Sequence, residues 1–316
     1  MSDLYAHLSA YDAHAWRRAI ETLAAEIHPI DRNATQIWFA FYPLDLHLAI
    51  SDAPDATSMV RKLGLMGHWR LSDQIDSSHR FLFAHRYWPQ VKHAVEQASA
   101  PFSSTLPALV TAVADAAVRT ARVDREMLLG MTAVALMTYR QVGAEAFNAA
   151  PGTIHLSDTT RARSPHQVMK ARARDNSQGP LGFLRGTNRR WTVTFDENDP
   201  EATFTVIQGQ ELASGAQTDK RDYKSRDPRC TPGEGPIPVE CRAASCGTCW
   251  VGVLGGADKL SAVVDRDERR RMAVFGYVDT DEPRPVIRLA CQARASGAVS
   301  IVIPPWNGMI ASCLRR

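Results

Sequence analysis

The first 150 residues carry apolar side chains at the three- and four-residue spacing of amphipathic helices. One stripe follows Asp12, a residue type that caps helices, and ends before Pro29; it consists of Trp16, Ile20, Leu23 and Ile27. A second comprises Leu106, Val110, Val113 and Ala117, and a third begins after Asp124 and runs from Met127 towards Phe147. The apolar runs 37–42 and 46–50 are too short for their period to identify them as helix or strand. We therefore expect a mainly helical domain over residues 1–150.

From residue 191 onward the apolar and polar positions alternate, which is typical of strands. Residues 191–195 and 203–207 alternate on either side of the turn 196–200, and this predicts a β-hairpin. Further strands are expected at 250–254, 286–289 and 298–303, with a short helix at 265–275. The chain is therefore expected to have an α+β fold, with a second domain over residues 191–305 and a C-terminal tail over 306–316.

Residues 151–190 are expected to connect these two domains. Pro-Gly, Ser-Pro and Gly-Pro pairs punctuate the segment. It holds eight basic residues against two aspartates, a net charge of +6. These basic residues are Arg161, Arg163, Lys170, Arg172, Arg174, Arg185, Arg189 and Arg190. The segment is either a solvated linker or an arm that lies along an acidic partner. No nucleic-acid partner is expected, because aromatic residues are scarce here and no recognition motif is present.

Composition excludes several classes of protein. Of the 316 residues, 45% are hydrophobic and 22% are charged, as in ordinary globular proteins. The longest nearly apolar run covers only residues 127–137, whereas a membrane-spanning helix needs about 20 residues, so no membrane span is expected. The N-terminus lacks the basic-then-apolar pattern of a secretion signal, which predicts a cytoplasmic protein. Six cysteines are too few for a disulfide scaffold.

The cysteines are concentrated at the C-terminal end of the chain. Cys241, Cys246 and Cys249 have the spacing C-x4-C-x2-C, and Cys291 follows 42 positions later. Four thiolates grouped in this way can hold two irons and two bridging sulfides, with one tight loop supplying three ligands. The small residues between the three clustered cysteines allow backbone N–H groups to approach the sulfurs. A structural zinc site is the alternative, but it usually needs two C-x2-C pairs and only one is present.

With these strands around it, the cysteine pattern resembles that of the plant-type [2Fe–2S] ferredoxin family. The resemblance covers roughly residues 191–305, a little over a third of the chain. It implies a β-grasp fold, a mixed sheet with one helix packed across it, and a single [2Fe–2S] cluster as cofactor. Three departures are expected to change the loop or its surroundings: Ala244 where the family often has glycine, a polar insertion over 219–235, and a longer gap before Cys291.

Other candidate ligands give weaker signals. Cys230 and Cys313 lie outside the cluster motif and are expected to be free thiols. The histidines of the first domain allow a haem or metal site, but no ligand motif accompanies them. His79, His85 and His93 lie near one another in sequence, with His68 upstream. Pro89 is expected to kink or end a helix that would place His85 and His93 on one face.

The sequence as a whole predicts electron transfer through the cluster. Residues 191–316 carry 16 basic and 17 acidic side chains, whereas freely diffusing plant-type ferredoxins are strongly acidic. We therefore expect an iron–sulfur subunit of a larger redox complex, with redox proteins as partners and the helical domain as the docking platform. An enzyme whose helical domain holds its own haem, metal or substrate site is the alternative, and a redox sensor ranks third. Neither a dinucleotide-binding fingerprint nor a P-loop is present.

Overall fold

The computed structural model describes residues 3–99, 104–172, 174, 189–263, 266–278 and 280–309. The chain divides into two compact units. Unit 1 contains residues 1–48 and 70–165, and unit 2 contains residues 49–69 and 166–316. Within the described ranges, no helix is long and apolar enough to cross a membrane.

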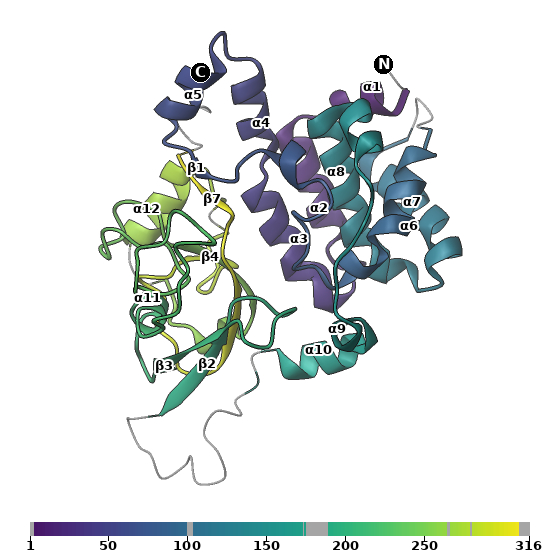
Figure 1. Cartoon of the computed structure of the whole chain (residues 1–316). Helices are drawn as coiled ribbons and strands as arrows, with labels where there is room; N and C mark the ends of the chain where they lie inside the picture. The colour runs from purple at the N-terminus through teal and green to yellow at the C-terminus, as the bar shows by residue number, and fades with distance from the viewer. Residues whose placement is uncertain are drawn as a thin grey trace. The chain divides into compact units, whose positions relative to one another are not determined.

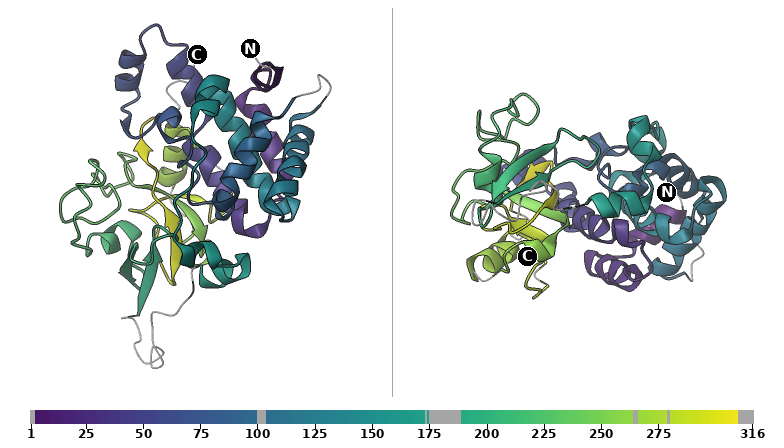
Figure 2. Two further views of the ribbon diagram at one scale, coloured as in Figure 1. Left: turned by 45° about the vertical axis from the view of Figure 1, so that its right-hand side comes forward. Right: turned by 90° about the horizontal axis from the view of Figure 1, so that it is seen from below.

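Unit 1 is a bundle of helices (Figure 1). Its elements are α1 (Asp3–Ser9), α2 (Ala13–Leu23), α3 (Pro29–Phe41), the start of α4 (Leu44–Ser51), the 3-10 turns η1 (Leu71–Gln74) and η2 (Phe83–Tyr87), α6 (Trp88–Glu96), α7 (Leu106–Ala121), α8 (Arg125–Ala149) and α9 (Asp158–Ala162). The long helix α8 contacts α1, α3, α6 and α7 and forms the centre of the bundle. Figure 2 shows these helices, coloured purple to teal, from two further sides.

The three predicted helices are present as α2, α7 and α8, although α2 ends at Leu23, before Ile27 of its stripe. Asp124 stands at the N-cap of α8 without a side-chain cap hydrogen bond. Asp12 accepts a hydrogen bond from the Ala15 backbone N–H at 2.7 Å and thereby starts α2. All four residues of the stripe expected in the second predicted helix are buried in α7. The ambiguous run 37–42 forms the end of α3 and its C-cap Tyr42, and the run 46–50 lies in α4. Burial of Ile37, Trp38 and Phe41 in the bundle stabilises the first run as the apolar face of a helix.

Unit 2 is built on a five-stranded mixed sheet with the strand order β3-β2-β6-β4-β5. Its strands are β2 (Arg190–Thr194), β3 (Thr203–Ile207), β4 (Trp250–Gly255), β5 (Ile287–Leu289) and β6 (Val299–Val302). The predicted hairpin is present as the antiparallel pair β2–β3, and β2 pairs in parallel with β6. The helices α11 (Leu212–Ala216) and α12 (Arg266–Phe275) complete the domain with the turn η4 (Ala257–Lys259). A helical N-terminal region followed by a mixed sheet confirms the α+β class.

A segment from the first half of the chain belongs to unit 2. It contains α5 (Ala56–Lys62) and β1 (Met66–Gly67), and β1 pairs with β7 (Trp306–Asn307) in a two-stranded antiparallel sheet. The His68 backbone N–H also donates to the Pro305 carbonyl at 2.9 Å. Residues 49–69 therefore join the C-terminal end of unit 2 through backbone hydrogen bonds.

The basic segment 151–190 is partly helical, because it contains α9 and α10 (Pro165–Ala171). One of its arginines differs from the expectation of an exposed arm. Arg172 donates two hydrogen bonds of 2.8 Å to Glu197, and its side chain is only 8% exposed. A bidentate pair of this kind fixes the geometry of both side chains, so Arg172 is occupied inside unit 2. Residue 173 and residues 175–188, which include Arg185, lie outside the described residues.

Candidate iron–sulfur site

The three clustered cysteines lie in one loop that leads directly into the strand β4, between β6 and β5 in the sheet. Cys241 and Cys246 are half-buried, and Cys249 is buried immediately before Trp250, the first residue of the strand. Cys291 is buried two residues after the end of β5. The Ala290 backbone N–H donates to the Cys249 carbonyl at 2.9 Å, because β4 and β5 pair in antiparallel fashion beside them. The sheet therefore brings Cys291 to the loop, although 42 positions separate it from Cys249.

Backbone N–H groups converge on the sulfur of Cys241. The donors are Ala243 at 3.4 Å, Ser245 at 3.3 Å and Cys246 at 3.3 Å. The side-chain amide of Gln292 donates to the sulfur of Cys291 at 3.4 Å. Donors of this kind stabilise a negatively charged sulfur, whether it is a thiolate or a cluster ligand.

The four thiols associate in two pairs. Cys246 hydrogen-bonds to the Cys241 sulfur; burial acts to raise the pKa of Cys241, but this bond and those from Ser245 and the backbone lower it to about 6. The Cys249 thiol donates to the Cys291 sulfur and lowers the pKa of Cys291 to about 6. The same bond, together with burial, raises the pKa of Cys249 well above its usual value. Cys241 thus lies next to Cys246, and Cys249 next to Cys291.

The loop adopts an uncommon backbone to achieve this arrangement. Arg242, Ala244 and Gly247 have φ values of +54°, +56° and +67°. The positive φ at Ala244 supplies a reason for the family's preference for glycine there, because the left-handed region costs an L-residue about 1–2 kcal/mol. Gly247 has a second constraint: a Cβ atom at this position would lie 2.1 Å from a ring carbon of Phe275. The ring of Phe275, at the end of α12, therefore packs directly on the loop.

Two polar networks that the sequence did not reveal hold the loop and Cys291 in place. The side-chain amide of Asn307 in β7 donates to the carbonyls of Gly247 and Thr248, and its oxygen accepts from Arg229. Arg229 also donates to the Pro304 carbonyl at 2.7 Å. The insertion that carries Arg229, the C-terminal strand and the cysteine loop are thus connected. No local pattern marks Asn307, because its partners are distant in sequence.

The second network is a buried ion pair between α12 and β5. Arg288 donates to Glu268 at 2.9 and 3.1 Å, and the two side chains are 1% and 2% exposed. Glu268 also accepts from the Leu289 backbone N–H at 2.8 Å, two residues before Cys291. A charged residue between Ile287 and Leu289 in an otherwise apolar strand is the sequence signal that indicates such a buried pair.

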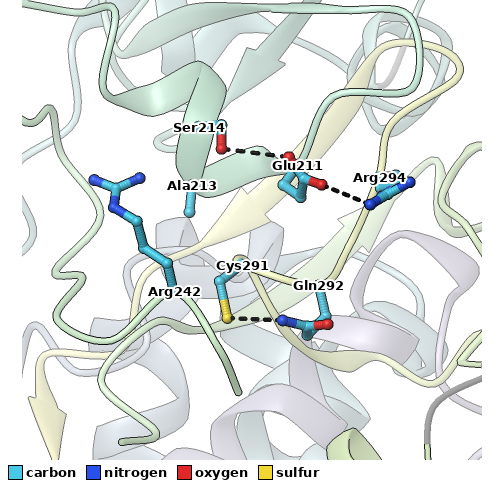
Figure 3. A pocket seen from close by; sticks show the side chains of 7 residues that line it. All are labelled: Glu211, Ala213, Ser214, Arg242, Cys291, Gln292 and Arg294. Atoms are coloured by element: carbon cyan, nitrogen blue, oxygen red, sulfur yellow. Dashed lines mark hydrogen bonds and ion pairs between the residues drawn. The ribbon is translucent and has the colours of Figure 1, made fainter. Parts of the chain in front are cut away.

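A polar pocket of about 310 Å³ opens beside Cys291 (Figure 3). It is lined by Glu211, Ala213, Ser214, Arg242, Cys291, Gln292 and Arg294. Glu211 pairs with Arg294 at 3.0 Å, and the side-chain amide of Gln292 donates to the sulfur of Cys291. A hydrophilic pocket therefore lies next to the buried Cys291.

Two of the candidate histidines meet: His79 and His85 are buried and their Nδ1 atoms lie 2.9 Å apart. His93 and His68 are exposed, and His68 belongs to unit 2. Pro89 stands in the first turn of α6, so His85 precedes that helix and His93 lies within it. Among the described residues, no three histidine, cysteine or carboxylate side chains are grouped to hold one metal ion.

The two remaining cysteines differ in what the structure describes. Cys230 is 1% exposed, its thiol lies 3.5 Å from the Pro236 carbonyl, and it is free, as expected. Burial raises the pKa of this thiol to about 11, which makes it a poor nucleophile and ligand. Cys313 lies outside the described residues.

Comparison with known proteins agrees with this site. Residues 232–296 match the family model of the 2Fe-2S iron-sulfur cluster binding domain. No curated protein and no solved structure matches the chain. The matched segment contains Cys241, Cys246, Cys249 and Cys291, and it lies in unit 2. The C-terminal part of the chain is thus a ferredoxin-like, β-grasp-like domain, and its cofactor is a [2Fe–2S] cluster.

The residues present suit this cofactor. A cluster of two irons takes two protein ligands per iron, so paired thiols are the expected arrangement. The two thiol pairs and the N–H groups directed at Cys241 meet that requirement.

Proposed function

We propose that this protein transfers electrons through a single [2Fe–2S] cluster bound by Cys241, Cys246, Cys249 and Cys291, as an iron–sulfur subunit of a larger redox complex. The observation that supports the ligand assignment is the pairing of β4 with β5, which brings Cys291 to the loop that holds Cys241, Cys246 and Cys249. When bound, the cluster supplies one-electron oxidation and reduction. The chain's own residues place the thiolates and supply donors to their sulfurs.

The burial of the four cysteines suggests where electrons enter and leave. Cys249 and Cys291 are buried, whereas Cys241 and Cys246 are half-buried and their neighbours Ala243 and Ser245 are exposed. A partner that approaches the loop at these two exposed residues comes closest to the sulfur ligands. We therefore assign the exposed side of the loop as part of the electron-transfer surface.

Charge and domain content support a fixed subunit over a freely diffusing carrier. Residues 191–316 are nearly neutral, with 16 basic and 17 acidic side chains, so the domain has little charge for long-range steering. The helical unit is a second module, and electron transfer by the cluster does not require it. We assign to it the docking of the other subunits.

Serine substitutions test the ligand assignment. Replacing any of the four cysteines by serine should reduce iron and acid-labile sulfide well below two of each per chain, because an alkoxide is a poor ligand for these irons. Cys230→Ser is the matched control and should leave both contents and the visible spectrum unchanged. An anaerobic preparation that holds zinc in place of iron would refute the assignment. So would loss of the cluster from Cys230→Ser with retention in Cys291→Ser.

Purification from the native cell tests the subunit role. The tagged protein should elute well above the 34.9 kDa of one chain, together with other redox proteins. A cluster-containing protein that elutes as a single chain, with no companion under low-salt conditions, would instead support a diffusing carrier.

A further inference from the structure

The helix α12 carries an unusual concentration of positive charge. It contains Arg266, Asp267, Glu268, Arg269, Arg270 and Arg271, but the buried Glu268 is neutralised by Arg288 of β5. The remaining charges of the helix sum to +3, whereas residues 191–316 as a whole are nearly neutral. Arg270 is exposed, and Arg269 and Arg271 flank it, half-buried.

Other arginines near the cysteines are engaged with carboxylates. Arg242 pairs with Glu234 at 3.0 Å and Arg294 pairs with Glu211 at 3.0 Å. On α12, Arg269 donates to the backbone carbonyl of Glu282 at 2.9 Å. Among the described side chains, Arg270 and Arg271 form no ion pair with a carboxylate. Their charge is therefore available to an external anion.

The helix is also in contact with the cysteine loop. Its last residue, Phe275, packs on Gly247, next to Cys246, and lies 6.0 Å from the ring of Trp250. Arg271 precedes Phe275 by one helical turn, so the two residues are neighbours on one side of α12. Basic side chains on a helix that packs on the cysteine loop are suited to association with an acidic protein.

We propose that Arg270 and Arg271 of α12 form the docking surface for an acidic redox protein. This inference rests on the proposed electron-transfer function and identifies the kind of partner. The partner presents carboxylates to the two arginines. Opposite charges at such a surface increase the association rate and orient the partner at the cysteine loop.

Small oxidants of opposite charge test this surface without the natural partner. The dithionite-reduced full chain is mixed in a stopped-flow instrument with the cobalt(III)–EDTA anion or with the hexaamminecobalt(III) cation. In each reaction one electron passes from the protein to cobalt(III), which becomes cobalt(II). Arg270→Glu and Arg271→Glu should each slow oxidation by the anion about two- to fivefold and accelerate oxidation by the cation. Added salt should reduce these differences.

Arg119→Glu is the control, because Arg119 is an exposed residue of α7 in the other unit and the change in net charge is identical. It should leave both rates nearly unchanged. Poly-L-glutamate should inhibit oxidation of the unaltered protein by the anion and should not inhibit that of Arg270→Glu. Equal effects of Arg119→Glu and Arg270→Glu, or inhibition by RNA but not by polyglutamate, would overturn the docking proposal. A protein with no reducible cluster would instead contradict the proposed function itself.

Discussion

The contact between Gly247 and Phe275 gives the sharpest test of how the loop is held. In Gly247→Ala the new methyl group would lie 2.1 Å from a carbon of the Phe275 ring, which is 4% exposed and packed against Trp250. The left-handed φ of +67° costs alanine about 1–2 kcal/mol, and displacing the ring costs about 1–3 kcal/mol more. The substitution should therefore destabilise the domain by about 2–5 kcal/mol in total.

Gly233→Ala separates the two contributions. Gly233 has a φ of +73°, and nothing lies within 4 Å of a Cβ atom built there, so only the backbone cost of about 1–2 kcal/mol applies. The rate at which the visible absorption disappears at a fixed urea concentration measures opening of the domain. Since each 1.4 kcal/mol corresponds to a factor of ten, Gly247→Ala should lose its absorption about five- to a hundredfold faster than Gly233→Ala.

The double variant Gly247→Ala/Phe275→Leu completes the test. Leucine lacks the outer ring carbons that the new methyl group would meet, so the double variant should be more stable than the sum of the two single effects predicts. Equal rates for Gly247→Ala and Gly233→Ala, or strict additivity in the double variant, would show that the ring does not constrain the loop.

Two further predictions concern buried charges. Glu268→Gln should lower stability by about 3–5 kcal/mol, because it leaves Arg288 buried without a counter-charge. Glu234→Gln, which alters a half-exposed pair, should cost no more than about 1 kcal/mol; similar losses of melting temperature in the two variants would contradict this difference. Burial lowers the pKa of His85 to about 4 and that of His79 further below its usual value, so both are neutral in the folded protein. The stability that depends on these neutral histidines should be fully present above pH 6.5. As the pH drops towards 4, the unfolded chain binds protons that the folded chain does not, and the free energy of unfolding should fall by up to about 3 kcal/mol from His85 alone. Circular dichroism at 222 nm should show this loss in melting scans, and a variant with phenylalanine at both positions that remained equally acid-sensitive would refute it.

The sequence by itself determined the elements whose signals are local. The spacing of Cys241, Cys246 and Cys249 indicated a cluster loop because three ligands in nine residues need no long-range information. Asp12 and the apolar stripe of α7 predicted helices, since capping and face burial depend on residues within a few turns. The alternation in β2 and β3 likewise predicted their hairpin. The assignment of Cys291 as the fourth ligand rested on the overall cysteine pattern, because no local signal places it beside the loop.

Only the tertiary structure decided which distant residues meet. The two-residue strand β1 is too short for a pattern, and it forms because β7 offers a partner edge. Asn307 and the Glu268–Arg288 pair act on the cysteine loop and on Cys291 across long stretches of sequence. Arg172 illustrates the same limit. Its charge predicted a place on an exposed arm, whereas in the folded chain it pairs with Glu197. A side chain's local sequence sets its chemistry, whereas its burial and partner depend on the path of the whole chain.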